Sequence, residues 1–147
     1  MDRLTVKVKI RSESGYLPSY ETEGSAGMDI AAFIKDDLTL YPGKTAVITT
    51  GLYIELPAYY EAQVRARSGL AAKHGIGLVN GIGTIDSDYR GEIKIILINW
   101  GHEPFTIKNG DRIAQLVIAG YEKAEWEESE ILGETKRSGG GFGHTGI

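Results

Sequence analysis

The chain has 147 residues, a length that fits one domain with a single hydrophobic core. It contains no cysteine, which excludes disulfides, thiolate metal sites and cysteine nucleophiles, and its three histidines are too few to favour a dedicated zinc site. The formal net charge of −4 argues against broad nucleic-acid binding, but a few arginines and backbone N–H groups could still hold a small anionic ligand.

Membrane and targeting signals are not expected from the sequence. No run approaches the ~18 uninterrupted apolar residues of a membrane-spanning helix. The first residues, Met1 to Lys7, lack the apolar segment of a secretory signal peptide. We therefore expect a cytoplasmic protein, with the nucleus or a virus-infected host cell as the alternatives.

Short β-rich runs follow one another along the chain. Residues 4–10 alternate apolar and polar side chains, and a Tyr41-Pro42-Gly43 turn precedes the next runs. Further strands are expected at 45–50, 52–56, 59–67, 76–79, 92–99 and 112–118. Sequential short strands and many glycines predict an all-β fold, a jelly-roll-like barrel or sandwich.

One short helix is expected at residues 68–74, with Ser68 as N-cap and Gly75 at the C′ position. Residues 111–118 could be a second helix by periodicity alone. We prefer a strand there because Leu116-Val117-Ile118 is a compact, largely β-branched run that Gly120 soon ends.

The composition changes at Tyr121. Residues 122–134 are acidic and the last residues are rich in glycine, so this segment has too little apolar surface to order itself. We therefore divide the chain into a β domain at 1–120 and a tail at 121–147. The tail is either disordered or docks on another surface such as a neighbouring subunit.

Two segments of the β domain could carry chemistry. Ser68-Gly69 at the start of the short helix, preceded by Arg65 and Arg67, suits a phosphate, although an ordinary N-cap beside structural arginines explains it equally well. In residues 80–91, Asn80 could read the edge of a nucleobase, and Asp86 or Asp88 could deprotonate a water. A polar hairpin between two strands is the simpler explanation for this second segment.

Three further segments are weaker evidence of a functional site when each is taken alone. The glycine-rich end around Phe142 could offer N–H groups to phosphates, but it is no Walker A loop and could be only a flexible terminus. Residues 110–116 read as a Gly-Asp turn that enters a strand. In residues 25–30, Asp29 could pair with a buried arginine as easily as face a metal.

Taken together, in order and at these spacings, five segments resemble the motifs of the trimeric dUTP pyrophosphatase (dUTPase) family. The match covers nearly the whole chain, and five motifs in order are far more specific than one. The segments are Ala26-Gly27-Met28-Asp29-Ile30, Arg67-Ser68-Gly69-Leu70-Ala71, residues 83–92, Gly110-Asp111-Arg112-Ile113-Ala114-Gln115-Leu116, and residues 137–146.

The resemblance implies a jelly-roll-like homotrimer with shared active sites that hydrolyses dUTP to dUMP and pyrophosphate. This activity would keep uracil out of DNA and supply dUMP for thymidylate synthesis. It also implies Mg²⁺ held through the triphosphate and waters, with no direct protein ligand and with Asp29 at most touching the metal's water shell. No nucleic-acid or membrane partner is implied.

The resemblance also assigns roles to residues. Asp86 is the base that activates water, Asn80 binds uracil, and Tyr89 lies under the deoxyribose and excludes a 2′-hydroxyl. Arg67 supports the phosphate region through Asp29. The tail would clamp the terminal phosphate and stack Phe142 on uracil. The remaining substrate contacts are Ser68, Gly69, Thr84, Ile85, Lys94, Gln115, Arg137, Gly143, His144 and Thr145.

The chain departs from the family pattern at three positions. His144 stands where many members have serine, Ser138 where many have glycine, and Gly120 where proline is common. A dCTP deaminase of the same fold, a nucleotide-sensing module and a purely structural jelly roll are the competing hypotheses. The third and fifth motifs argue against the deaminase, and Asp86 with the complete tail argues against a pure sensor.

Overall fold

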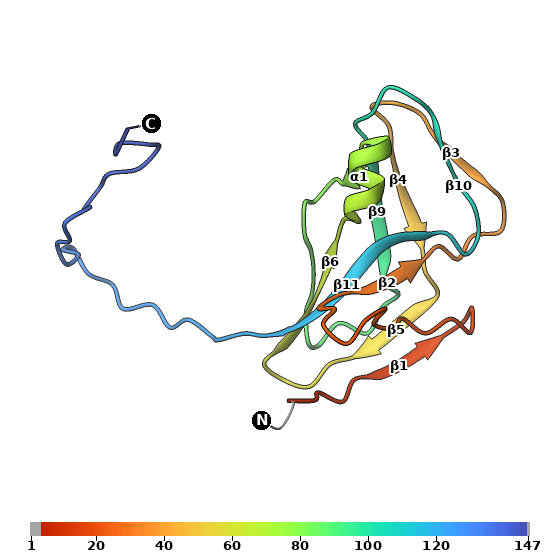
Figure 1. Cartoon of the computed structure of the whole chain (residues 1–147). Coiled ribbons are helices and arrows are strands. Elements are labelled where there is room, and N and C mark those ends of the chain that lie inside the picture. Colours follow the sequence, from red (N-terminus) through yellow and green to blue (C-terminus); the bar gives the residue numbers. More distant parts are fainter. Residues whose placement is uncertain (1–3, 147) are drawn as a thin grey trace.

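The computed structural model describes residues 4–146 and consists of β-strands with one short helix (Figure 1). The fold class is therefore all-β, as the sequence predicts. In chain order the elements are β1 (Lys9–Ser12), β2 (Met28–Ala31), β3 (Leu38–Leu40), β4 (Thr45–Thr49), β5 (Leu52–Glu55), β6 (Tyr60–Arg65), α1 (Ser68–His74), β7 (Ile76–Leu78), β8 (Gly83–Ile85), β9 (Lys94–Asn99), β10 (Phe105–Ile107) and β11 (Arg112–Gly120).

Two sheets carry the core. One has the strand order β2-β11-β6-β8 and the other β4-β9-β7, while β1 pairs with β5 and β3 with β10. All of these pairings are antiparallel. Neighbours in space are mostly not neighbours in sequence, which is the connectivity of a jelly roll rather than of a simple meander.

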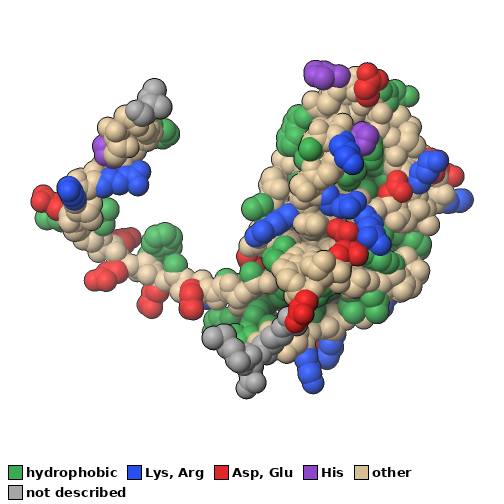
Figure 2. All heavy atoms as spheres, in the orientation of Figure 1, with side chains coloured by type: hydrophobic (Ala, Val, Ile, Leu, Met, Phe, Trp, Pro, Cys, Tyr) green, Lys and Arg blue, Asp and Glu red, His purple; other side chains and the backbone are tan. Residues whose placement is uncertain are grey.

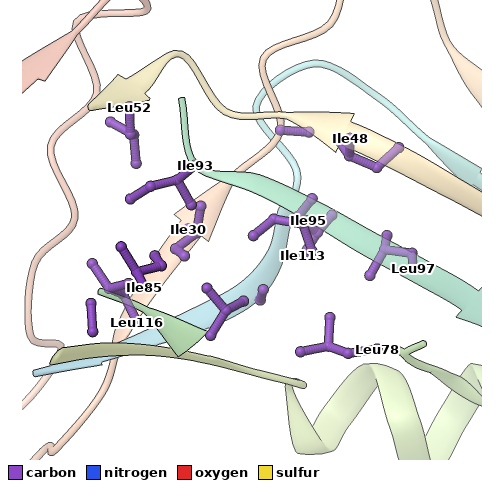
Figure 3. Close-up of a cluster of buried hydrophobic side chains, with 14 of the residues drawn as sticks. Ile30, Ile48, Leu52, Leu78, Ile85, Ile93, Ile95, Leu97, Ile113 and Leu116 are labelled. Atoms are coloured by element: carbon purple, nitrogen blue, oxygen red, sulfur yellow. The ribbon is translucent and has the colours of Figure 1, made fainter. Parts of the chain in front are cut away.

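The core lies between these two sheets. Along β9 the side chains of Ile95 and Leu97 are buried while Lys94 and Ile96 are exposed, because successive residues of a strand point to opposite faces. Figure 3 shows Ile95 of β9 facing Ile30 and Ile113 from the opposite sheet. Burying each such side chain contributes about 1.5–3 kcal/mol, so this layer dominates the stability of the domain.

The structure confirms most of the expected strands, with shifted ends. Residues 112–118 belong to β11, which pairs with β2 on one side and β6 on the other, so the preference for a strand over a helix is correct. The expected strand at 4–10 is wrong over residues 4–8, which have no partner strand in the described chain. The strands β2, β3, β8 and β10 were not predicted, because runs of three or four residues are too short to show alternation.

The helix α1 has the predicted bounds. Gly75 ends it with φ 67°, and its N–H donates to the carbonyl of Ala71. The predicted N-cap is wrong: Arg67 is the N-cap with an extended backbone, and Ser68 is already the first helical residue. In the part of the chain that the structure describes, no helix is long and apolar enough to cross a membrane.

Asn99 joins the end of β3 to the loop between β9 and β10 from a fully buried position. Its Nδ2 donates to the carbonyls of Leu40 (2.9 Å) and Glu103 (2.8 Å), and its Oδ1 accepts from the N–H of Gly101 (2.8 Å). Asn99→Ala removes one buried and two part-buried hydrogen bonds to backbone groups. We expect it to lower the free energy of unfolding by about 2–4 kcal/mol.

Urea denaturation would measure this loss. The control is Asn109→Ala, which removes a single hydrogen bond of an exposed side chain to the N–H of Ile34. Asn109→Ala should lower the free energy of unfolding by less than half as much as Asn99→Ala. Equal losses in the two variants would contradict the role given to Asn99.

The segment 121–146 forms no helix or strand and extends away from the body (Figure 1). Its large apolar side chains are almost fully exposed, at 91% for Trp126, 83% for Ile131 and 81% for Leu132. Acidic side chains line its first half (Figure 2). The expected division at residue 120 coincides with the end of β11, although residues 1–3 and 147 of the two expected parts lie outside the described chain.

Candidate active site

A hairpin between the two main sheets builds the candidate site. Its first strand, β7, pairs with β9, and the N–H of Val79 still donates to the carbonyl of Ile96. After the turn, β8 pairs instead with β6, where Gly83 lies opposite Val64. The hairpin therefore crosses from one sheet to the other, and a pocket opens between β8 and β9.

This hairpin pocket has a volume of about 220 Å³. It brings together six of the predicted site residues: Asn80, Thr84, Ile85, Asp86, Tyr89 and Lys94. It also has lining residues that the sequence reasoning did not assign: Val64, Leu78, Gly83, Glu92, Ile93, Ile95 and Ile96. Most of these are apolar residues of β-rich runs, so nothing in the sequence distinguishes them from ordinary core residues.

The floor of the hairpin pocket depends on the glycine at position 83, which has no side chain. A Cβ atom at Gly83 would lie 3.3 Å from Nδ2 of Asn80 and 3.2 Å from Cβ of Val64. Both distances are tighter than an ordinary van der Waals contact. Glycine at this position therefore leaves room for the Asn80 amide to stay at the pocket, where it can both donate and accept hydrogen bonds.

Two more polar residues of the pocket, Tyr89 and Asp86, are held by backbone contacts. Tyr89 is 45% exposed, and its hydroxyl donates to the carbonyl of Glu92 at 2.8 Å, which fixes the ring beside the pocket. The N–H of Tyr89 donates to the carbonyl of Asp86 at 3.1 Å, which closes a turn directly after β8. The Asp86 side chain is solvent-accessible, so water can reach its carboxylate.

The two candidate carboxylates of this turn are not equivalent. Asp86 lines the hairpin pocket, whereas Asp88 lines a neighbouring hollow of about 560 Å³ together with Tyr59 and Tyr121. Asp86 also borders that hollow, which we call the outer hollow. The geometry therefore favours Asp86 over Asp88 as the group that faces a ligand in the pocket.

A second group of predicted residues lies around Asp29, whose side chain is only 8% exposed. Its two carboxylate oxygens face Nε of Arg67 at 3.4 Å and Nη1 of Arg112 at 3.5 Å. The Gln115 amide reaches Oδ1 at 3.5 Å. The expected pairing of Asp29 with Arg67 is therefore present, while the sequence reasoning missed Arg112.

Tyr16 also belongs to this second group. Its hydroxyl donates to the backbone carbonyl of Asp29 at 2.8 Å. Burial raises the pKa of Tyr16 above its ordinary value, and the negative charge of Asp29 acts in the same direction, although Arg112 opposes them. The phenol therefore stays protonated and keeps donating this bond at neutral pH.

Ser68 and Gly69 begin α1 and are exposed. The N-cap residue, Arg67, makes no side-chain capping bond, so the N–H groups of the first turn remain available. A Cβ at Gly69 would meet open space, so the structure gives no steric reason for glycine there. Neither residue is among those that line the hairpin pocket.

The tail carries the third group. Lys136, Arg137, Gly143, His144 and Thr145 line a hollow of about 530 Å³ within the tail itself. Nε of Arg137 donates to the carbonyl of Gly140 at 2.6 Å, and the Phe142 ring is fully exposed. A single chain thus presents its predicted site residues in three groups, and the end of the tail stands away from the β domain (Figure 1).

An amide, a carboxylate and an aromatic ring surround one small pocket of this β-sheet protein. Such a pocket is typical of proteins that bind small ligands. Within that class the chain belongs to the dUTPase family, because the family model of that description matches residues 13–146.

Relatives of this chain carry a common description. The deoxyuridine 5'-triphosphate nucleotidohydrolase of Finegoldia magna is 54% identical over 142 residues, which cover 96% of this chain and 99% of that protein. The enzyme of the same name from Rickettsia felis is 56% identical over 143 residues, with 97% of each chain covered.

A solved structure has the same fold. It is the dUTPase of Staphylococcus bacteriophage 80alpha with dUPNHPP, which is 26% identical and superposes with a TM-score of 0.83. The match covers 97% of this chain and 99% of the phage protein. The all-β, jelly-roll-like fold predicted from the sequence is therefore supported by both the strands and the structural neighbour.

Proposed function

We propose that this chain hydrolyses dUTP to dUMP and pyrophosphate, so that it keeps uracil out of DNA and supplies dUMP for thymidylate synthesis. The observation that carries the proposal is the pocket that collects Asn80, Asp86 and Tyr89 in a chain of the dUTPase family. In this reaction Asp86 takes a proton from a water that attacks the α-phosphorus. The bond from that phosphorus to its bridging oxygen then breaks, and pyrophosphate leaves.

The base and the sugar would occupy the hairpin pocket. The Asn80 amide offers a donor and an acceptor that match the edge of uracil. We expect the hairpin backbone around Asn80 to lie too close to a bound uracil to admit a 5-methyl group. Thr84, Ile85 and Lys94 line the same pocket and complete the contacts, with Tyr89 placed against the deoxyribose.

The phosphates would lie against the groups outside this pocket. Ser68 and Gly69 offer N–H groups at the start of α1, and Gln115 adds an amide, while Arg67 supports them through Asp29. Arg137, Gly143, His144 and Thr145 of the tail, with Phe142 stacked on uracil, would close the site. His144 can donate a hydrogen bond where serine is common in the family.

Magnesium would enter with the nucleotide. Both oxygens of Asp29 already face arginines, and among residues 4–146 no three His, Asp or Glu side chains gather closely enough to hold a metal. This set of donors fits a cation that is held by phosphate oxygens and waters, with Asp29 near its water shell. When bound, Mg²⁺ neutralises charge on the triphosphate.

A homotrimer with shared sites would bring the three groups together, with residues 1–120 as the domain and the tail 121–147 completing a neighbour's site. An exposed apolar face supports association. Val47 lies opposite Ile96 in the sheet, and the N–H of Val79 donates a hydrogen bond to the carbonyl of Ile96. The three side chains are exposed by 58% (Val47), 36% (Ile96) and 46% (Val79). Contiguous apolar patches of this kind usually mark contacts with another chain.

The test of the function is pyrophosphate release from dUTP, dTTP, dCTP and UTP with Mg²⁺. We expect release from dUTP at least tenfold above the other three. Ammonia release from dCTP would instead indicate a deaminase, and tight dUTP binding with negligible turnover would indicate a sensor. Light scattering on the same sample should give the mass of a trimer.

Tyr89→Ala should weaken discrimination of the sugar more than discrimination of the base. A ring fixed beside the pocket leaves neither space nor a hydrogen-bond partner for a 2′-hydroxyl. We expect the ratio of kcat/KM for dUTP over UTP to fall by about 10–100-fold, the effect of a contact worth roughly 1.4–2.8 kcal/mol. The ratio for dUTP over dTTP should stay within a factor of three, and a larger fall in that ratio would assign Tyr89 to the base instead.

A further inference from the structure

We propose that Tyr121, the residue at which the tail leaves the domain, is a positioning residue for Asp86. It would act through Ser87, which it contacts directly. The proposal rests on the proposed function, in which Asp86 activates the attacking water. It gives this chain one more residue that determines the rate, outside the five family motifs.

Tyr121 is fastened to the domain at several points. Its N–H donates to the carbonyl of Tyr59 at 2.9 Å, and the two rings lie 6.3 Å apart at an angle of 48°. Within the tail itself, Nζ of Lys123 stands 5.4 Å from the Tyr121 ring. The chain therefore leaves β11 with its first aromatic ring fixed, although Gly120 stands immediately before it.

Tyr59 holds an unusual conformation where it meets Tyr121. Its φ is +68°, in the left-handed region that non-glycine residues rarely adopt. A residue held there is strained, and such strain persists only where surrounding contacts stabilise it. The backbone bond and the ring pair with Tyr121 are contacts of that kind.

The Tyr121 hydroxyl reaches the active-site turn. It lies 3.4 Å from Oγ of Ser87, a half-buried side chain directly after Asp86. Tyr121, Ser87 and Asp86 all line the outer hollow, and Asp86 also lines the hairpin pocket. The turn is therefore a wall between the two spaces, and Tyr121 supports it from the side opposite the ligand.

Other contacts hold different atoms of the same turn. Nη1 of Arg90 donates to the carbonyl of Ser87 at 2.6 Å, and its Nη2 faces Glu55 at 3.5 Å. These contacts fix the backbone after Asp86, whereas Tyr121 holds the Ser87 side chain. A small displacement of a reacting group can cost a large factor in rate, so this second support can matter although the bond itself is long.

The experiment compares kcat and KM for dUTP in the full-length wild type, Tyr121→Phe, Ser87→Ala and the double variant. Phenylalanine keeps the ring pair and the backbone bond to Tyr59, so the tail stays anchored and only the hydroxyl is lost. We expect kcat to fall about 3–10-fold in Tyr121→Phe, which matches the worth of one hydrogen bond. KM should stay within twofold and the melting temperature within about 2 °C.

The double variant tests whether Tyr121 and Ser87 affect kcat through the same contact or independently. If Tyr121 acts through Ser87, the double variant should be no slower than Ser87→Ala alone, because both changes remove the same contact. Tyr41→Phe is the control, since it removes an exposed tyrosine hydroxyl in a turn far along the chain from Asp86, and it should leave both constants unchanged.

Three results would overturn the inference: an unchanged kcat in Tyr121→Phe, multiplicative losses in the double variant, or a raised KM with normal kcat, which would mean that Tyr121 only anchors the tail. These results are distinct from a failure of the proposed function. If the wild type releases no pyrophosphate from dUTP, that function fails before any variant is compared.

Discussion

Asp86→Asn is expected to lower kcat for dUTP by about 10²–10⁴-fold, the usual effect of losing a general base. The asparagine side chain has nearly the same shape but cannot accept the proton of the attacking water. The turn that carries the residue depends on the Asp86 backbone carbonyl, which the substitution leaves intact. Binding of a non-hydrolysable imido analogue of dUTP should therefore stay within about threefold, as measured by calorimetry.

Asp88→Asn is the matched control, because it makes the same change two residues away on a side chain that borders the outer hollow and not the hairpin pocket. It should keep at least a third of the wild-type kcat. A large loss in Asp88→Asn with normal turnover in Asp86→Asn would transfer the role of the base to Asp88.

Deletion of residues 137–147 is expected to lower turnover by at least 10²–10³-fold without unfolding the domain. Removing one preorganised donor from an active site can already cost this much, and the deletion removes the Arg137 guanidinium, a ring and several N–H groups together. None of the buried core residues belongs to this segment, so the melting temperature should change by less than about 2 °C.

Two further measurements make the tail prediction specific. Phe142→Ala should be milder and should weaken nucleotide binding by roughly 1–3 kcal/mol, the value of a base–aromatic stack. Light scattering should give the same number of subunits for the deleted and the full chain. Full activity of the shortened chain would show that the glycine-rich end takes no part in catalysis.

The longer elements of the fold could be predicted because their patterns are local. The helix α1 shows good helix formers followed by Gly75, and β9 is an apolar run rich in β-branched isoleucine. The pairing of β11 with β2 joins residues more than 80 positions apart, and its register depends on the packing of both sheets. No pattern within a short window carries that information.

The candidate site shows a similar division. Asn80, Asp86 and Tyr89 stand out as candidates within residues 80–91 of the sequence, and the structure gathers them around one pocket. The apolar walls and the contacts behind Asp86 could not, because residues such as Val64 and Tyr121 carry no chemical signal of their own. Only the crossing of the hairpin from one sheet to the other puts them beside the reactive groups.

The position of β11 has a consequence for how the protein is made. It is the last strand in the described part of the chain, yet it lies inside its sheet, between β2 and β6. Until β11 has been synthesised, β2 and β6 each have an unpaired edge, so a nascent chain cannot complete this sheet during most of its translation. A ribosome that stalls before residue 112 would release a chain with two open edges, which is the kind of species that chaperones must hold or proteases remove.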